Sequence, residues 1–478
     1  MKKLFILLLV PFISSAQIDT VNLQLNASHL FPSFPYKSSY SAKLDQRQGM
    51  NYIYSANMEF GLGIYQYSSP GTLNNITNLP NSTFNNLEAG TVEIKGTSLF
   101  IGIGNYHNNN NTSSGLAILD ITNPATPVIK DIWDSAAFTH GINHIVLDGD
   151  YAYLSTMSDG IIILNIADEN NIRFESTLSL DLSWPVSSTN AHNARGMMIK
   201  NDSLFVCFDR GGLRVVDVTD KANPSEIYKY INTSLTSVAA AAYNDIAIKG
   251  NYAFVSVDYC GMEIIDISSA PFTAVQWYNP WGCNFTNWSG AEIHTNEVRL
   301  GSHDSLLFVS GARSELFVFD VTDPLNTVKK GEYINLSDSI ASNGLDVYNG
   351  KVLLSLLRAA IHLPPLTPFY SDPGGLELLD YQVVLQPVST SEMNPFTNIN
   401  VTPNPATHLL QLQFNSSKRG RFEISILNVL GETLQTKEIS SNGTTINEKF
   451  PVEQFSPGIY LLRIQSGSYF RTVKFIRE

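Results

Sequence analysis

Residues 115–127 read Gly-Leu-Ala-Ile-Leu-Asp-Ile-Thr-Asn-Pro-Ala-Thr-Pro, and this stretch decides the fold. Its pattern returns as Gly-Leu-Arg-Val-Val-Asp-Val-Thr-Asp at 212–220 and as Gly-Met-Glu-Ile-Ile-Asp-Ile-Ser at 261–268. A pattern that recurs at a nearly constant offset indicates repeated supersecondary units that stack on one another. Repetition of this kind reveals architecture more directly than biochemical activity, because one fold serves many functions.

Each unit is marked by the Asp of the pattern or by a residue that replaces it. The markers are Gln66, Asp120, Asn165, Asp217, Asp266, Asp320 and Asp380. Seven units of about fifty residues follow from this spacing. Two short apolar runs precede each marker strand and one follows its turn, so each unit should contain four strands. Four strands per repeat are typical of a blade in a β-propeller.

The marker strand explains why the units must stack. Residues 116–121 are apolar on both alternating faces, so neighbouring sheets should cover both sides. Asp120 needs hydrogen bonds in such a run, and we expect it to fasten the following turn rather than bind a metal. The last unit lacks the usual proline turn after Asp380. We therefore expect the segment 21–25 to complete the last blade and close the ring.

Composition favours an exported all-β protein. Apolar residues make up 43% and charged residues 15% of the 478 residues. The net charge is −13; residues 396–478 contain nine Lys or Arg and six Glu, a balance of +3, so residues 1–395 carry −16. This acidity argues against nucleic acid as a partner. Residues 1–16 have the basic start, apolar run and small-residue end of a signal peptide, and no later run is long enough to span a membrane.

Three cysteines are too few for a disulfide scaffold. Cys207 lies in an apolar run and is expected to be a buried thiol, whereas Cys260 and Cys283 lie in turn or loop segments. Cys260 and Cys283 are therefore candidates for one disulfide, and the sequence leaves open whether it forms.

The repeats resemble the LVIVD family over roughly residues 40–385. The quoted stretches and Leu-Phe-Val-Phe-Asp-Val-Thr-Asp-Pro at 316–324 carry this resemblance, which departs from the pattern at Gln66 and Asn165. The resemblance implies a seven-bladed β-propeller and brings no general enzymatic activity with it.

The residues after 388 form a linker and a second domain. Alternating runs separated by turns predict a small β-sandwich. This tail resembles the type A C-terminal sorting domain of the type IX secretion system, through Val-Thr-Pro-Asn-Pro at 401–405, Ile-Leu-Asn-Val-Leu-Gly at 426–431, and Phe-Ser-Pro-Gly-Ile-Tyr at 455–460. The matching sorting-signal residues are Pro403, Asn404, Pro405, Gly431, Gly458, Tyr460 and Lys474. A carbohydrate-binding β-sandwich is the alternative.

The resemblance implies a partner and a destination. The tail would direct the protein to the type IX secretion machinery, and the protein would be secreted or located on the outer cell surface. The expected domains are a signal peptide at 1–16, a propeller at 17–388, a linker at 389–397 and the sorting domain at 398–478.

The long connections of a propeller with this strand order share one face, and long loops on a rigid scaffold are where binding usually resides. We expect residues at this face to approach the axis. The candidate ligand-binding residues are His140, His144, His192, Arg195, Asp245, Trp281, Trp288, Glu292 and His294. The histidines and carboxylates could serve a metal or proton transfer, or could only hydrogen-bond their neighbours around the channel. The tryptophans could stack on sugars, anchor a protein, or form the core of their own loop.

Familiar catalytic signatures are absent from the sequence, including nucleophile elbows, zinc-protease motifs and phosphate-binding loops. We predict no catalytic residue, metal or cofactor. The leading hypothesis is a secreted or surface-attached propeller that binds a protein or glycan. The alternatives are an extracellular hydrolase or lyase with an axial His and carboxylate site, and a purely architectural surface protein.

Overall fold

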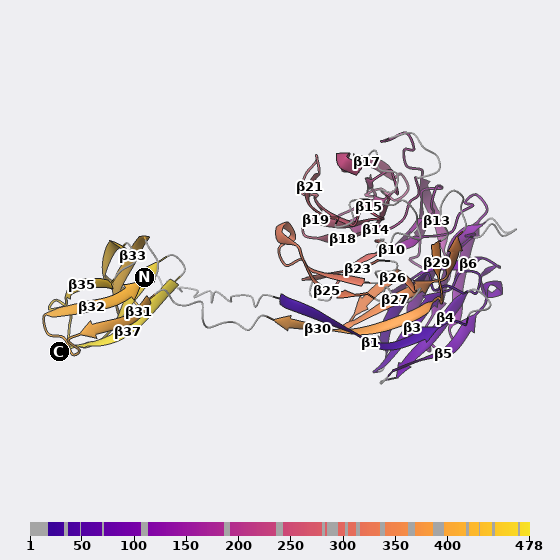
Figure 1. Ribbon diagram of the computed structural model, residues 1–478. Helices are drawn as coiled ribbons and strands as arrows, with labels where there is room; N and C mark the ends of the chain where they lie inside the picture. Colours follow the sequence, from indigo (N-terminus) through magenta and orange to yellow (C-terminus); the bar gives the residue numbers. More distant parts are fainter. Residues whose placement is uncertain are drawn as a thin grey trace. The chain divides into compact units, whose positions relative to one another are not determined.

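The computed structural model forms two compact units, a larger one spanning Gln17–Leu385 and a smaller one that includes Gln386–Glu478 (Figure 1). The structure describes residues 18–32, 37–47, 49–68, 71–106, 113–185, 192–235, 242–279, 283, 295–301, 305–311, 316–334, 340–361, 369–385, 396–416, 420–429, 431–441, 445–466 and 469–478. The predicted signal peptide lies outside these residues. No helix in the described ranges is long and apolar enough to cross a lipid bilayer.

The larger unit is a β-propeller, and its described strands form seven four-stranded blades. Six blades use consecutive strands, which run in order from the innermost to the outermost position. Blade 1 contains β2 (Ser41–Arg47), β3 (Met50–Ala56), β4 (Leu62–Ser68) and β5 (Thr72–Leu79). Blade 2 contains β6 (Glu88–Lys95), β7 (Ser98–Gly104), β8 (Ser114–Asp120) and β9 (Val128–Ser135). Blade 3 contains β10 (His144–Asp148), β11 (Tyr151–Ser155), β12 (Ile161–Asn165) and β13 (Arg173–Leu178).

The remaining consecutive blades follow the same order. Blade 4 contains β14 (Met197–Lys200), β15 (Ser203–Cys207), β16 (Leu213–Asp217) and β17 (Ser225–Tyr230). Blade 5 contains β18 (Tyr243–Lys249), β19 (Tyr252–Val257), β20 (Met262–Asp266) and β21 (Thr273–Tyr278). Blade 6 contains β22 (Val298–Leu300), β23 (Leu306–Ser310), β24 (Leu316–Asp320) and β25 (Val328–Tyr333). The described connections contain three short 3-10 helices, η1 (Asn81–Phe84), η2 (Thr233–Leu235) and η3 (Pro324–Asn326).

Blade 7 closes the ring with the N-terminal strand. It runs from β26 (Ala341–Tyr348) through β27 (Lys351–Leu357) and β30 (Gly375–Leu385) to β1 (Ile18–Leu30). In the antiparallel pairing of β1 with β30, Val21 lies opposite Val383 and Leu25 opposite Leu379. This confirms the expectation that segment 21–25 completes the last blade. A small hairpin, β28 (Ala359–Ile361) and β29 (Phe369–Ser371), lies between β27 and β30 in the sequence.

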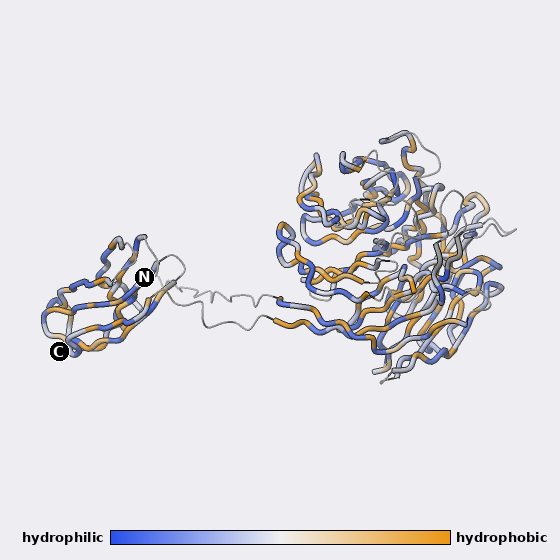
Figure 2. The backbone as a smooth tube through the Cα atoms, in the orientation of Figure 1, coloured by the Kyte–Doolittle hydropathy of each residue, from blue (hydrophilic) through white to orange (hydrophobic). Residues whose placement is uncertain are grey.

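The propeller core lies between blades, as the doubly apolar marker strands predict. Leu116 and Ile118 of blade 2 are fully buried and pack in one cluster with Ile145 and Leu154 of blade 3. Ala117, which points to the other face of the same strand, belongs instead to a cluster with residues of blade 1. Figure 2 shows the resulting hydrophobic segments along the propeller strands. Burial on both faces is what holds neighbouring blades together.

The marker Asp fastens the turn between the third and fourth strands. Oδ1 of Asp120 accepts a hydrogen bond from the Thr122 N–H at 2.8 Å, and Asp217 accepts one from Thr219 at 2.9 Å. These hydrogen bonds lower the pKa of both carboxyls. Asn165 accepts one from Ala167 at 3.1 Å, so its amide oxygen replaces the carboxylate. Asp380, which no such turn follows, instead accepts hydrogen bonds from Lys351 and from Asn26 of β1.

The smaller unit is a sandwich of two sheets. One sheet contains β31 (Phe396–Thr402), β32 (Leu409–Ser416) and β35 (Thr445–Pro451). The other contains β34 (Thr433–Ser441), β33 (Gly420–Asn428), β36 (Gly458–Ser466) and β37 (Tyr469–Arg477). Strand β31 begins two residues before the predicted domain start at 398. Buried residues of both sheets, including Phe414, Phe422 and Leu462, form one core.

The sorting-signal residues include two that join parts of this sandwich. Asn404 Oδ1 accepts a hydrogen bond from the Ile476 N–H at 2.9 Å, which ties the segment after β31 to the last strand. The Tyr460 hydroxyl donates to the Ser456 carbonyl at 2.7 Å, and its ring stacks on that of Phe475. Asn404 and Tyr460 of the sorting signal therefore make contacts that hold the small domain together.

Candidate functional site along the propeller axis

The innermost strands surround the axis, and a small cavity of about 50 Å³ lies where these strands begin. We call this cavity the neck. The beginnings of the innermost strands face the same end of the propeller as the long connections between blades. The neck is lined by Tyr40, Asn143, His144, Arg195, Gly196, Asn244, Asp245, Asn296, Glu297 and Asn343.

Asparagines tie neighbouring blades together around the neck. The Asn244 side chain donates to the Thr295 carbonyl at 2.9 Å, and Asn296 donates to the Ser342 carbonyl at 3.2 Å. Asn343 continues the series across the ring closure by donating to the Tyr40 carbonyl at 2.9 Å. Each bond runs from one blade to the chain that begins the next. The side chains around the neck are thus used to join blades.

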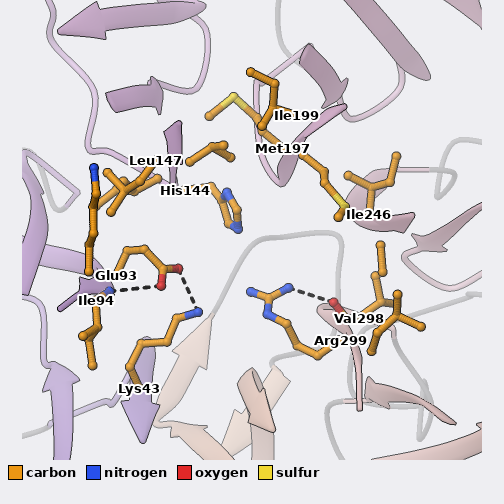
Figure 3. A pocket seen from close by; sticks show the side chains of 16 residues that line it. Lys43, Glu93, Ile94, His144, Leu147, Met197, Ile199, Ile246, Val298 and Arg299 are labelled. Atoms are coloured by element: carbon orange, nitrogen blue, oxygen red, sulfur yellow. Dashed lines mark hydrogen bonds and ion pairs between the residues drawn. The ribbon is translucent and has the colours of Figure 1, made fainter. Parts of the chain in front are cut away.

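A larger cavity of about 540 Å³ continues along the axis toward the far ends of the innermost strands, and we call it the channel cavity (Figure 3). Its apolar wall is formed by Ile94, Ile145, Val146, Leu147, Met197, Met198, Ile199, Ile246, Ala247, Val298 and Leu300. Its polar lining consists of Lys43, Glu93, Lys95, His144 and Arg299. A volume of this size lies in the range of small-molecule pockets.

Beside the channel cavity, two cations are each shared by two carboxylates. Lys43 Nζ lies 2.8 Å from Glu93 and 3.8 Å from Asp346. The Arg299 guanidinium pairs with Asp245, and it lies 3.1 Å from Glu297. We call these six residues the axial network. With every member ionised, four negative charges face two positive ones.

The axial network also joins blades through backbone N–H groups. Asp245 of blade 5 accepts from the Val298 N–H at 3.0 Å, and Glu297 accepts from Leu345 of blade 7 at 2.9 Å. Asp346 of blade 7 accepts from Leu44 of blade 1 at 2.8 Å. Together with the pairing of Lys43 in blade 1 and Glu93 in blade 2, these contacts extend from blade 5 across the ring closure to blade 2. The network therefore has a structural role.

Burial changes the protonation of two residues at the axis. Desolvation raises the pKa of Glu297 to about 7, with the negative charge of Asp245 adding to the effect and Arg299 opposing it. Desolvation also lowers the pKa of His144 to about 4, so its imidazole is neutral near pH 7. His144 Nδ1 has no hydrogen-bond partner among the described residues.

The structure brings together only some of the predicted face residues. His144, Arg195 and Asp245 line the neck. His140 does not; its side chain is 46% exposed, and its Nδ1 lies 3.0 Å from Asp159. His192 is buried and packs against the Phe208 ring, with a centroid distance of 5.7 Å. Trp281, Trp288, Glu292 and His294 lie outside the described residues.

An ion pair and a disulfide connect segments near the loop-rich face. Arg195 pairs with Asp209, which also accepts from Asn193 at 2.6 Å. Cys260 and Cys283 form a disulfide, whereas Cys207 is a buried free thiol.

Buried charges in the marker strands anchor two long connections. Arg214, which is fully buried, donates to the carbonyls of Asp181 at 3.1 Å and Trp184 at 2.8 Å. Glu263 accepts from the Tyr230 and Tyr243 hydroxyls, each at 2.6 Å. Arg214 and Glu263 occupy the place in the motif that Ala117 holds in its own repeat. A buried charge at this variable place in the motif therefore anchors a loop.

Sequence reasoning missed Lys43, Glu93, Glu297, Arg299 and Asp346. Lys43, Glu93, Arg299 and Asp346 lie within the first strand of a blade and Glu297 directly precedes one, so a charged residue in or next to a first strand is the signal that could have found them. Among the residues that the structure describes, no group of three or more His, Cys, Asp or Glu has the arrangement of a metal site. The axial network could instead hold a charged or hydrogen-bonding group of a guest.

Solved structures that are similar to this chain match it at low sequence identity. The WD40 repeats of RRP9 match with a TM-score of 0.51 and 10% identity, over 76% of this chain and all of that one. A chain of the mitotic checkpoint complex matches with a TM-score of 0.48 and 11% identity, over 79% of this chain and 95% of that one. No curated protein sequence matches this chain.

Two sequence families match separate parts of the chain. The LVIVD repeat matches residues 90–135, 191–232 and 242–272, and the secretion system C-terminal sorting domain matches residues 400–478. The fold and these matches define the class as an exported β-propeller protein. More particularly, the propeller contains stretches that match the LVIVD repeat, and the chain ends in a type IX C-terminal sorting domain, which directs it to the cell surface or the extracellular space.

Proposed function

We propose that the protein is an exported binding module that recognises a protein or glycan through the loop-rich face of its propeller. The observation that carries this proposal is the anchoring of long connections by buried charges. Arg214 holds the connection after β13, and Glu263 holds the connection after β17 through Tyr230 and Asn232. Fixing the segments where such connections begin reduces the conformational entropy that they lose on binding, which favours affinity.

The small volume of the neck favours a ligand that binds to the surface of this face over a small-molecule substrate. Its volume of about 50 Å³ is far below that of a small-molecule pocket, and its asparagines are committed to contacts between blades. A protein or glycan can lie across such a narrow opening while contacting the surrounding loops. Trp281 and Trp288 are the aromatic side chains that we propose as anchors, because large aromatic residues dominate many binding interfaces.

The experiment is a screen of the purified protein against glycan and outer-surface protein arrays, followed by affinity measurement on each hit. Trp281→Ala or Trp288→Ala should weaken binding by about 30-fold, the loss typical of an interface hot spot. Phe174→Ala is the matched control, because this exposed aromatic lies on the outermost strand of blade 3. Binding that survives both tryptophan substitutions would exclude these anchors.

One observation favours a second candidate, an extracellular hydrolase or lyase. A carboxyl with a pKa raised to about 7, as at Glu297, is suited to general acid catalysis, and such shifts gather at functional sites. Of the predicted face histidines that the structure describes, however, only His144 lines the neck with Asp245 and Glu297, whereas His140 and His192 do not. Turnover of a polysaccharide that disappears in Glu297→Gln would favour this candidate over the binding module.

The processing of the chain belongs to the same proposal. We propose that residues 1–16 are removed as a signal peptide, that 17–388 act as the propeller and that 389–397 link it to the sorting domain at 398–478. Mass spectrometry of the protein recovered from the cell exterior tests both ends. An N-terminus at Gln17 is expected, and a retained residue 1 would contradict it.

A further inference from the structure

The channel cavity is a second site, separate from the loop-rich face. It reaches Lys95, Leu147, Ile199 and Leu300, which lie at or next to the C-terminal ends of their strands. These ends face the side of the propeller opposite the long connections. At about 540 Å³, the cavity has room for a small organic molecule.

The lining of the cavity is aliphatic on one side and charged on the other. Blades 3, 4 and 5 contribute an aliphatic surface that includes Val146, Met198 and Ile246. Lys43 approaches from blade 1 and Arg299 from blade 6, and Figure 3 shows their charged ends pointing toward one another. A guest that fills this space must therefore be amphipathic.

The charged groups that line the cavity are mostly basic. They are Lys43, Lys95 and Arg299 against the single carboxylate of Glu93. Both oxygens of that carboxylate already have donors, because one accepts from the Ile94 N–H at 3.0 Å and the other lies 2.8 Å from Lys43 Nζ. The lining therefore offers a guest positive charge and hydrogen-bond donors.

The other carboxylates of the axial network do not line the cavity. Asp245, Glu297 and Asp346 each accept a hydrogen bond from a backbone N–H of a neighbouring blade. Desolvation raises the pKa of Glu297 to about 7, so this carboxyl is only about half ionised near pH 7. These three residues hold Lys43 and Arg299 in position, whereas a guest in the cavity meets the cations themselves.

Both cations keep donors for a guest. The bonds of Arg299 to two carboxylates and to the Val298 carbonyl use three of its five N–H groups. Lys43 Nζ has three N–H groups; Glu93 lies at 2.8 Å, but Asp346 at 3.8 Å is beyond hydrogen-bond distance. The side chains of Lys43 and Arg299 are 15% and 20% exposed, and both line the cavity. Acceptor atoms of a guest can thus bond to both cations without displacing a carboxylate.

We propose that the channel cavity binds a small aliphatic carboxylate of the fatty-acid type. Its carboxylate lies between Lys43 and Arg299, and its alkyl chain lies along the wall of blades 3 to 5 toward the far ends of the innermost strands. A carboxylate supplies two acceptor oxygens and one negative charge, and its hydrogen bonds to Lys and Arg are of the strong, charge-assisted kind. His144, which lines the same cavity, is neutral near pH 7 because burial lowers its pKa to about 4, so it adds no charge to this selection.

The test is calorimetric titration of the full chain with three probes of equal chain length, hexanoate, 1-hexanol and n-hexylammonium. Hexanoate should bind about tenfold more tightly than hexanol, because its head group forms charge-assisted hydrogen bonds with both cations. Hexylammonium should bind most weakly, because it brings a third positive charge between Lys43 and Arg299. Hexanol or hexylammonium that binds as tightly as hexanoate, or no binding of any probe, would overturn the proposal.

Two variants locate the site. Lys43→Gln should weaken hexanoate by about tenfold and leave hexanol nearly unchanged, since only hexanoate forms charge-assisted bonds. A purely structural role of Lys43 would not separate the two probes. Lys330→Gln, which removes the same charge from the outermost strand of blade 6, is the matched control and should change neither affinity. Val146→Phe should weaken both probes by filling the cavity.

The outcomes remain decisive if one variant fails to fold. Without a folded Lys43→Gln protein, the order of the three probes on the natural sequence decides the charge preference, and Val146→Phe decides the location. An unchanged preference for hexanoate in a folded Lys43→Gln protein would refute the place of the head group. Undiminished binding to a folded Val146→Phe protein would refute the site.

Discussion

Replacing Arg299 by Met is the sharpest test of the axial network. Met retains much of the aliphatic length of Arg but removes the cation that Asp245 and Glu297 share. Both carboxylates would then remain beside the axis with their backbone hydrogen bonds but without a counter-charge. Removing one partner of a buried ion pair costs about 3–5 kcal/mol.

This cost can be converted into a change in melting temperature. Unfolding entropy near 60 °C is about 2.1 cal/mol/K per residue, so the 369 residues of Gln17–Leu385 give about 0.8 kcal/mol/K for a propeller that unfolds as one unit. A loss of about 3–5 kcal/mol then lowers Tm by about 4–6 °C. Differential scanning calorimetry of the natural protein and Arg299→Met measures this shift.

Two further measurements distinguish the effect of the uncompensated carboxylates on Tm from the effect of lost side-chain packing. Adding Glu297→Gln to Arg299→Met should restore part of the Tm, because one uncompensated carboxylate disappears. The Tm deficit of Arg299→Met should also be smaller at pH 5 than at pH 8. Without Arg299, which opposes the effect of burial, the pKa of Glu297 rises further above its unfolded value than the value of about 7 in the natural protein, so the variant loses more stability as pH increases. A shift under 1 °C, or one independent of pH, would refute the reasoning.

The remaining predictions concern pH, the ring closure, the disulfide and the marker Asp. Because the pKa of Glu297 is raised from 4.5 to about 7, stability should fall between these pH values, and Glu297→Gln should flatten that part of a Tm-versus-pH curve. Deleting Ile18–Leu30 should expose the edge of β30 and cause aggregation, detectable by light scattering; a soluble monomer would contradict this. Cys260→Ser should cost about 3 kcal/mol, since the bridge closes a loop with a sequence separation of 23, and a reductant should lower the Tm of the natural protein but not of the variant. Asp217→Ala should lower Tm at pH 7 more than at pH 2, because the lowered pKa stabilises the fold only where the carboxyl is ionised, whereas Asp217→Asn should nearly match the natural protein.

The fold could be predicted because each feature of the sequence recurs. The turn after Asp120 is difficult to interpret alone, but its equivalents at Asp217 and Asp266 show the same spacing, and all three accept the expected hydrogen bond. The substituted marker Asn165 does not disturb the count of repeats, because it retains the acceptor that the turn requires.

The site could be predicted only in part, because side-chain direction near the axis depends on local irregularities. The pairing of β26 with β27 shifts between Ser342 and Leu345, and the pairing of β18 with β19 shifts between Tyr243 and Asp245. A shift of one residue sends a side chain to the opposite face of a strand. Asp346 and Asp245 therefore join one network although they occupy different positions in their repeats.

A fixed offset also fails where the chain is irregular. Counting back from the turn of each repeat predicts that His140 and His192 occupy equivalent places. The connection before β10 places His140 beside Asp159, whereas the connection before β14 buries His192 against Phe208. Counting predicts positions along strands, but loops of different length direct equivalent residues to different surroundings.

The use of β1 as the outermost strand of blade 7 determines when the propeller can finish folding during export. A chain that emerges with its first residues leading presents β1 long before its partner β30, which ends at Leu385. The ring can therefore become complete only after almost the whole propeller has emerged. The sorting domain follows immediately in the sequence, so the part that the secretion machinery reads appears only once the cargo is able to finish folding.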